Sequence, residues 1–154
     1  MGITVGMENS AALANITTFG VGDLRRERAF YDDLGWPIVF DSDDFVVFQF
    51  GSALFALFPT DKLAADSRAQ PEPRHGGIRS STIVNVDAPE DVDALVERAE
   101  RAGATVTKPP TEAEFFAGRD AYFADPEGNY WEIAYAPDDN PVTAAARRAA
   151  NRPS

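Results

Sequence analysis

An internal repeat constrains this fold more than any other feature of the sequence. Residues 23–35 and 91–103 have the same length, and each carries apolar residues at helical spacing. Both segments end on a glycine, which is where a glycine commonly terminates a helix. Val21 and Val86 hold corresponding places in the strand-like runs before them, with three extra residues before the second helix. The repeat predicts two copies of one structural unit.

Strand-like runs rich in β-branched and aromatic residues surround both helical segments. Glycine, proline, serine and acidic residues mark the turns between them. The resulting order is β-α-β-β-β, a linker, and β-α-β-β-β again. The expected strands are residues 15–22, 37–41, 45–50, 53–58, 80–86, 105–108, 119–124 and 129–136, and the expected helices are residues 23–34 and 89–102.

This order predicts an α+β fold in which two βαβββ modules form a curved, cup-shaped mixed sheet with the helices on its outer face. The uncovered face would line the cup, which is a natural place for a small molecule. The predicted boundaries are a leader (1–13), a first module (14–58), a linker (59–78), a second module (79–137) and a tail (138–154) that can form a short helix over residues 142–150. Residues 109–118 are expected to be a loop.

Composition excludes several classes of function. The 154 residues carry a net charge of −11, which disfavours binding to nucleic acid or to an anionic membrane surface. No cysteine is present, so disulfides, zinc ribbons and thiol catalysis are excluded. The single histidine, His75, lies in a Pro- and Gly-rich segment and is interpreted as a solvated loop residue. No secretory signal or membrane-spanning segment is recognised, so we expect a cytoplasmic protein.

Several short motifs occur in an order that resembles a known family. They include Val21-Gly22-Asp23-Leu24, Leu34-Gly35-Trp36 and, in the second half, the run from Asp125 to Glu132 with the sequence DPEGNYWE. Over residues 15–137 the chain is similar to the vicinal oxygen chelate superfamily, which contains glyoxalases, bleomycin-resistance proteins and extradiol dioxygenases. The resemblance implies paired βαβββ modules, a cup-shaped sheet and a homodimer.

Metal-dependent members of that family place one ligand on the first strand and one on the last strand of each module. Carried over to this sequence, the four positions are Ile16, Phe55, Ser81 and Glu132, with Thr18 replacing Ile16 if the register shifts by two. Only Glu132 supplies a carboxylate, whereas a divalent metal needs three or four nitrogen or oxygen ligands. The resemblance therefore implies a member without a metal or other cofactor.

Glu132 is the candidate catalytic residue, and it is also a candidate ligand contact. Tyr130 shares its face of the predicted strand, because side chains alternate along a strand. A simple hairpin register would place Arg119 on that face as well, where it could pair with Glu132, whereas a bulge would place Tyr122 there. Phe116 is expected either to close the core or to stack on a flat ligand.

The complete set of expected ligand-binding residues is Ile16, Thr18, Phe55, Ser81, Phe116, Arg119, Tyr130 and Glu132. From the resemblance and the acidic charge we expect a metal-free protein that sequesters a cationic or aromatic small molecule between two subunits. The alternatives are a lyase or isomerase that uses Glu132 as a general base and a catalytically inert member. We expect no nucleic-acid or membrane partner.

Overall fold

The computed structural model describes residues 15–71 and 77–151. The expected leader and His75 lie outside the described residues. The first module consists of β1 (Ile16–Val21), α2 (Leu24–Leu34), β2 (Ile38–Asp41), β3 (Val46–Phe50) and β4 (Ala53–Pro59). After α3 (Thr60–Ser67), the second module consists of β5 (Ser81–Asn85), α4 (Pro89–Ala102), β6 (Thr105–Glu112), β7 (Arg119–Ala124) and β8 (Tyr130–Tyr135), and α5 (Pro141–Ala150) follows.

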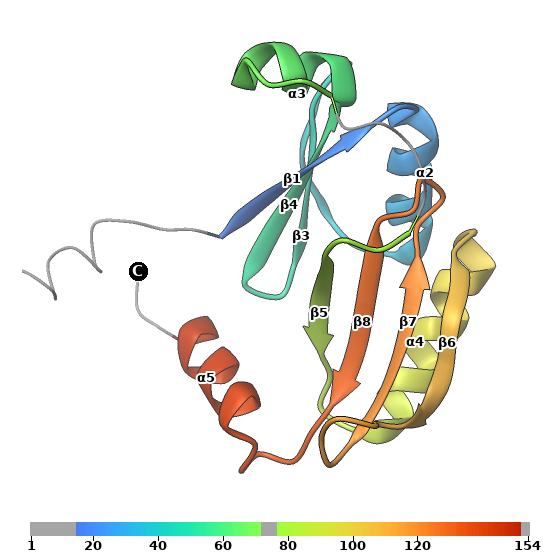
Figure 1. Cartoon of the computed structure of the whole chain (residues 1–154), viewed down its shortest axis with the longest axis vertical. Helices are drawn as coiled ribbons and strands as arrows, with labels where there is room; N and C mark the ends of the chain where they lie inside the picture. The colour runs from blue at the N-terminus through green and yellow to red at the C-terminus, as the bar shows by residue number, and fades with distance from the viewer. Residues whose placement is uncertain (1–14, 72–76, 152–154) are drawn as a thin grey trace, which may run out of the picture.

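Each module forms its own four-stranded mixed sheet. The strand orders are β1-β4-β3-β2 and β5-β8-β7-β6, with β1 parallel to β4 and β5 parallel to β8. The α+β class and the two βαβββ modules are therefore confirmed. The expected single sheet is instead two sheets, each with its own set of hydrogen-bonded strands (Figure 1).

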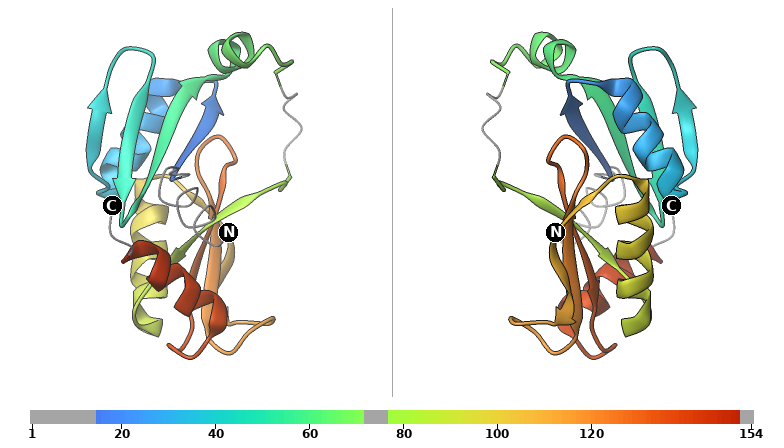
Figure 2. Two further views of the ribbon diagram at one scale, coloured as in Figure 1. Left: turned by 90° about the vertical axis from the view of Figure 1, so that its left-hand side faces the viewer. Right: turned by 90° about the vertical axis from the view of Figure 1, so that its right-hand side faces the viewer.

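Helices α2 and α4 lie on the same side of the two sheets, and the core lies beneath them (Figures 1 and 2). Asp23 caps α2 by accepting a hydrogen bond from the Arg26 amide at 3.0 Å, and Gly35 ends it with a φ of 96°. Aromatic side chains from both modules fill the centre of the core, where Phe55 and Trp131 have ring centroids 5.4 Å apart. We call the opposite face of each sheet the cup face.

The residues expected to form a linker contain a helix. The eight residues of α3 follow β4 directly, and Pro59 occupies the position before the first helical residue. Arg68 ends the helix in the left-handed region with a φ of 58°. The prolines that mark a linker in the sequence therefore lie before and after α3 and not inside it.

The residues expected to form a loop after position 108 instead extend strand β6. This strand continues through Pro109 and Pro110 to Glu112, with register shifts on either side of Lys108. Because β6 is the outer strand of its sheet, its prolines leave few ladder hydrogen bonds unmade. The tail helix expected over residues 142–150 is present as α5. No helix in residues 15–71 or 77–151 is long and apolar enough to cross a membrane.

Candidate functional site

The cup face of the second module carries the candidate carboxylate. Ser81 lies opposite Tyr130, and Ile83 lies opposite Glu132, across the parallel β5–β8 pair. Because these positions alternate with the buried Trp131, they all point away from α2 and α4. Glu132 is 8% exposed, so its carboxylate is largely shielded from bulk solvent.

Tyr122 is the partner of Glu132. The two residues lie directly opposite each other on β7 and β8, and the Tyr122 hydroxyl donates a hydrogen bond to Oε1 of Glu132. This hydrogen bond is the first cause of a rise in the pKa of Tyr122 to about 12, with burial and the Glu132 charge contributing further. Tyr122 therefore stays protonated and remains a hydrogen-bond donor at neutral pH.

An ion pair lies on the same face. Lys108 contacts the buried Asp120 at 2.7 Å, and its ammonium group lies 5.8 Å from the centre of the Tyr122 ring. Lys108, Tyr122 and Glu132 follow one another across β6, β7 and β8. The sequence analysis did not identify Lys108 or Asp120 as part of this row, because the register between the strands is not visible in the sequence.

Arg119 does not face the cup, which corrects one expectation. It forms a bidentate ion pair with Asp93 of α4, with 2.7 Å from Nε to Oδ1 and 2.8 Å from Nη2 to Oδ2. Its side chain therefore lies on the helix side of the sheet. The hairpin closes with Asp125 paired to Asn129, so three residues form its tip and Gly128 has a φ of 85°. This loop length places Tyr122, and not Arg119, beside Glu132.

Phe55 is also not on the cup face. It is 1% exposed and packs against Trp131 in the aromatic core, beside a small cavity of about 130 Å³ that Thr17 and Thr82 also line. The turn before β4 has two residues and is shorter than the loop before β8. The alternation of core-facing and cup-facing side chains on β4 is therefore shifted by one residue relative to β8. In the parallel register, Ala56 takes the place that Glu132 has in the second module.

Ile16 and Thr18 lie on the cup face of the first module, where they are paired with Leu54 and Ala56. Ile16 is 56% exposed. Phe116 is half-buried against Gly118, before the end of β7 that pairs with Tyr135. It is therefore at the end of the sheet away from Tyr130.

A cavity of about 1260 Å³ brings three of the expected residues together. Thr18 comes from the first module, and Ser81 and Tyr130 come from the second. Helix α3, residues 69–71 and 77–80, neighbouring residues of β1 and the loop residues 127–129 also line its described part. Glu132 is not in this lining, but it lies two residues along β8 from Tyr130 on the same face.

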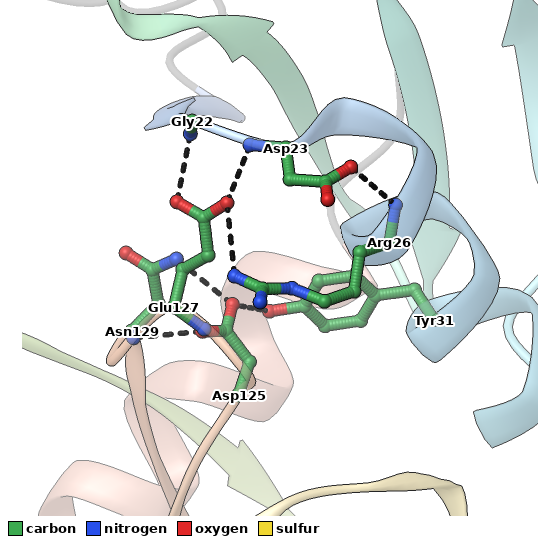
Figure 3. A network of polar contacts seen from close by, with 7 residues as sticks. All are labelled: Gly22, Asp23, Arg26, Tyr31, Asp125, Glu127 and Asn129. Carbon is green, nitrogen blue, oxygen red and sulfur yellow. Dashed lines mark hydrogen bonds and ion pairs between the residues drawn. The ribbon is translucent and has the colours of Figure 1, made fainter.

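Part of the cavity wall also joins the two modules (Figure 3). The Glu127 carboxylate accepts hydrogen bonds from the amides of Gly22 and Asp23 at 2.7 and 2.6 Å, and it contacts Arg26 at 3.4 Å. These groups lie at the beginning of α2, where the helix dipole favours a negative charge. Glu127 of the DPEGNYWE run thus attaches the second module to the first.

Asp125 forms the buried part of this connection. Its carboxylate accepts hydrogen bonds from the Tyr31 hydroxyl at 2.6 Å and from the backbone amides of Glu127 and Asn129 at 2.9 Å (Figure 3). The Tyr31 oxygen in turn accepts a hydrogen bond from Nε1 of Trp131 at 3.0 Å. Burial and the adjacent Asp125 charge hold the pKa of Tyr31 well above its ordinary value.

Glu27 is buried beside this network. It is 0% exposed, and neither of its carboxyl oxygens has a hydrogen-bond partner in the described structure. Burial raises the pKa of Glu27 to about 10, and the nearby Asp125 carboxylate adds to the rise. Glu27 is therefore a neutral acid at pH 7.

The cup face does not offer the ligands that the metal of the metal-dependent relatives requires. Its four corresponding positions hold Ile16, Ala56, Ser81 and Glu132, which supply one carboxylate and one hydroxyl. Within residues 15–71 and 77–151, no group of three or more Asp, Glu or His side chains could hold a metal ion. The residues present therefore do not fit that metal.

Helix α3 contributes cavity residues that the sequence analysis missed. Thr60, Leu63, Ala64 and Ser67 all line the cavity. Their i, i+3, i+4, i+7 spacing is the one signal that could have revealed a helix with one face turned toward the protein. The segment is too short, and too close to prolines, for that signal to have stood out.

Comparison with known proteins agrees with this architecture. The chain is 31% identical to a glyoxalase-related enzyme from Fulvimarina pelagi, over 81% of this chain and 88% of the other, with a TM-score of 0.72. It is 25% identical to a glyoxalase/bleomycin resistance protein/dioxygenase family enzyme from Burkholderia phytofirmans PsJN (79% and 96% covered, TM-score 0.69) and 26% identical to a lactoylglutathione lyase from Agrobacterium tumefaciens (81% and 94% covered, TM-score 0.61). No curated protein matches with significance.

A sequence model of a whole family provides the assignment. It matches residues 13–133, which include both modules except for the last two residues of β8. The chain therefore belongs to the Glyoxalase/Bleomycin resistance protein/Dioxygenase superfamily.

Proposed function

We propose that this protein binds a small organic molecule, without a metal, in the cavity beside α3. The observation that carries the proposal is the meeting of Thr18, Ser81 and Tyr130 in one cavity of about 1260 Å³. This volume exceeds the roughly 300–1,000 Å³ of typical ligand pockets, and it leaves room for a drug-sized molecule. The walls come from both modules, so the cavity forms only when the two modules are folded and packed together.

The chemistry of the wall supports a ligand with an aromatic body and a positive charge. Tyr130 supplies a half-buried ring, and Leu63 and Ala64 supply apolar contact on the α3 side. Asp61 contributes an exposed carboxylate to the lining, and the net charge of −11 raises the local concentration of cations around the molecule. Tyrosine rings also attract cations directly.

Three probes that share a phenyl ring and differ in charge test this proposal. Benzyltrimethylammonium, benzyl alcohol and benzoate would be titrated into the protein by calorimetry and by NMR. We expect saturable binding of the ammonium compound and weaker binding of the other two. Failure of all three to bind, or a preference for benzoate, would contradict the proposal.

Two substitutions on β5 test whether the ammonium probe binds in this cavity. Ser81→Trp fills the cavity from β5 and should weaken ammonium binding by at least about tenfold, since a hydrophobic site loses roughly that much when its fit is spoiled. Asn85→Trp introduces the same ring on the cup face of β5 but outside the cavity lining, and it should leave binding unchanged. Equal effects of the two variants would place the ligand elsewhere.

A second candidate function is a lyase or isomerase reaction with Glu132 as the general base. The observation that favours it is the pairing of a shielded carboxylate with Tyr122, because a base beside a protonated hydroxyl can take one proton while the hydroxyl stabilises the resulting anion. Incorporation of deuterium into phenylacetone in D₂O, followed by NMR, tests for proton abstraction. Exchange that persists unchanged in Glu132→Gln would remove this candidate.

A further inference from the structure

Each of the two sheets begins with a strand that has a free edge. Among the described strands, β1 is hydrogen-bonded only to β4, and β5 is hydrogen-bonded only to β8. Every second residue of such an edge strand points its backbone N–H and C=O groups away from the sheet, where they can pair with another extended chain. The free edges of β1 and β5 are therefore candidate binding surfaces.

The hydrogen bonds between β1 and β4 show which backbone groups of β1 point outward. The Leu54 amide donates to the Asn15 carbonyl at 2.9 Å, and the parallel register continues this alternation along the strand. The backbone groups of Ile16, Thr18 and Gly20 therefore point away from β4. Within the part of the chain that the structure describes, these groups have no hydrogen-bond partner.

The outer edges of the two sheets are protected against pairing, whereas the edge of β1 is not. Strand β6 carries Pro109 and Pro110, and register shifts interrupt its pairing with β7. Strand β2 has only four residues and also contains a register shift. Prolines, bulges and short length are common means of keeping an edge from pairing with another chain. The six residues of β1 contain no proline, no charge and no register shift, so its edge is open.

The open edge of β1 borders the cavity. Thr18 and Gly20 both line the space of about 1260 Å³, so unpaired backbone groups form part of its wall. The lining continues along β1 to Val21. At about 3.3 Å per residue, this stretch matches roughly three residues of an extended chain.

Strand β5 offers a shorter free edge to the cavity. The Val86 amide donates to the Ala134 carbonyl at 2.9 Å, so the backbone groups of Ser81, Ile83 and Asn85 point outward. Of these three residues, only Ser81 lines the cavity. An extended ligand in the cavity therefore finds more backbone partners on β1.

We propose that the cavity binds a short, extended peptide with a positive charge, which adds as a strand to the free edge of β1. The inference rests on the proposed function, and it adds the class of ligand: a chain of amides. The peptide exchanges hydrogen bonds with the outward backbone groups of Thr18 and Gly20, as peptides do when they extend a sheet. Its positive charge complements the net charge of −11 and the Asp61 carboxylate in the cavity wall.

The first test compares three forms of one peptide on the unmodified protein. Acetyl-Phe-Lys-Val-amide would be titrated by calorimetry and NMR, beside forms methylated on the Lys nitrogen or on the Val nitrogen. Neighbouring amides of a strand point to opposite sides, so only one of the two methyl groups blocks a hydrogen bond to β1. We expect saturable binding of the unmethylated peptide and a difference of about threefold to tenfold between the two methylated forms. Equal affinities of these two forms would contradict strand addition.

Proline substitutions test which edge the peptide uses. Thr18→Pro removes one outward N–H and keeps the pairing with β4, because an edge strand accepts proline where its N–H faces away from the sheet. It should weaken peptide binding by about threefold to tenfold. Thr18→Val keeps the amide and should bind the peptide more tightly than Thr18→Pro.

Asn85→Pro is the matched control, because it removes an outward N–H from β5 outside the cavity lining. It should leave peptide binding unchanged. Circular dichroism would establish that each variant is folded. If Thr18→Pro does not fold, the two methylated peptides on the wild-type protein decide the question.

The outcomes separate this inference from the proposed function. If the wild-type protein binds benzyltrimethylammonium but not the peptide, strand addition is wrong and the binding function stands. If it binds neither, the proposed function fails and the inference fails with it. If Asn85→Pro weakens peptide binding as much as Thr18→Pro, the edge of β1 is not the binding edge. If sedimentation shows that Thr18→Pro converts a dimer into a monomer, this edge pairs with a second copy of the chain, and the proposal is overturned.

Discussion

Tyr31 of the first module and Asp125 of the second are joined by a buried hydrogen bond of 2.6 Å. The two residues are 94 positions apart in the chain, so this bond forms only when both modules are in place. Trp131 extends the contact by donating to the Tyr31 oxygen. The acidic motif that first suggested the family is thus a structural connection in this protein.

Tyr31→Phe should lower the free energy of unfolding by about 1–3 kcal/mol, because it removes one donor from the buried Asp125 carboxylate and leaves the buried Nε1 of Trp131 without its acceptor. Urea denaturation monitored by circular dichroism would measure the change. Tyr135→Phe, which removes a hydroxyl from a half-buried ring of β8, is the control and should have a smaller effect. A loss below about 0.5 kcal/mol for Tyr31→Phe would show that the connection is not stabilising.

Stability should decrease as the pH rises because of Glu27. Its pKa is about 10 in the folded protein against 4.5 as its ordinary value, so between these pH values the folded state keeps a proton that the unfolded state releases. The free energy of unfolding from this group therefore falls with increasing pH, by at most about 1.4 kcal/mol per pH unit.

Glu27→Gln should remove that pH dependence and stabilise the protein at neutral and alkaline pH. Glutamine resembles the protonated acid in shape and cannot lose the proton. Urea midpoints at pH 5, 7 and 9 would test the prediction, with Glu100→Gln on the exposed side of α4 as the control. An identical pH profile for wild type and Glu27→Gln would contradict it.

Glu132→Gln should preserve the fold, because the amide oxygen can still accept the hydrogen bond from Tyr122. Glu132 lies outside the cavity lining, so it acts on a bound quaternary ammonium through its charge alone, and the variant should bind benzyltrimethylammonium about 1 kcal/mol more weakly. Its binding of benzyl alcohol should change little. Equal losses for the charged and neutral probes would mean that Glu132 supports the site without contacting the charge.

The purified protein should contain no stoichiometric divalent metal. The cup face presents Ile16, Ala56 and Ser81 at three of the four positions that hold ligands in metal-dependent relatives. Elemental analysis after dialysis should find less than about 0.1 equivalent of zinc, nickel, iron or manganese, since one carboxylate cannot retain these ions. A value near one equivalent per chain would require a different set of ligands.

The protein should form a homodimer in solution. Ile16 and Ile83 are 56% and 48% exposed on the cup faces, and this apolar surface would be covered by a second chain. Sedimentation velocity at micromolar concentration should give about twice the chain mass of 16.7 kDa. A single species with the mass of one chain would count against this arrangement and against sequestration between subunits.

Local signals in the sequence predicted most of the fold. Asp23 and Gly35 mark the two ends of α2, Pro89 and Gly103 mark those of α4, and Trp131 is buried as strand alternation predicts. The family resemblance also led to Glu132, which lies on the cup face because it alternates with Trp131.

The remaining features depend on the register between strands and on contacts between distant segments, which the sequence does not display. Phe55 and Arg119 were assigned to the wrong face because one residue more or less in a hairpin reverses every side chain after it. Nothing in the sequence singled out Glu27, which is buried beside Asp125 and Glu127 of the second module. Helix α3 was missed because its two turns depend on packing against Gly20.

The aromatic core has a practical consequence for following this protein by spectroscopy. The chain has two tryptophans, Trp36 and Trp131, and their ring centroids lie 5.0 Å apart in the contact between the modules. Intrinsic fluorescence therefore reports on the separation of the modules from within the molecule. A signal that stays constant while a probe titrates would place the response at the cavity wall, away from that contact.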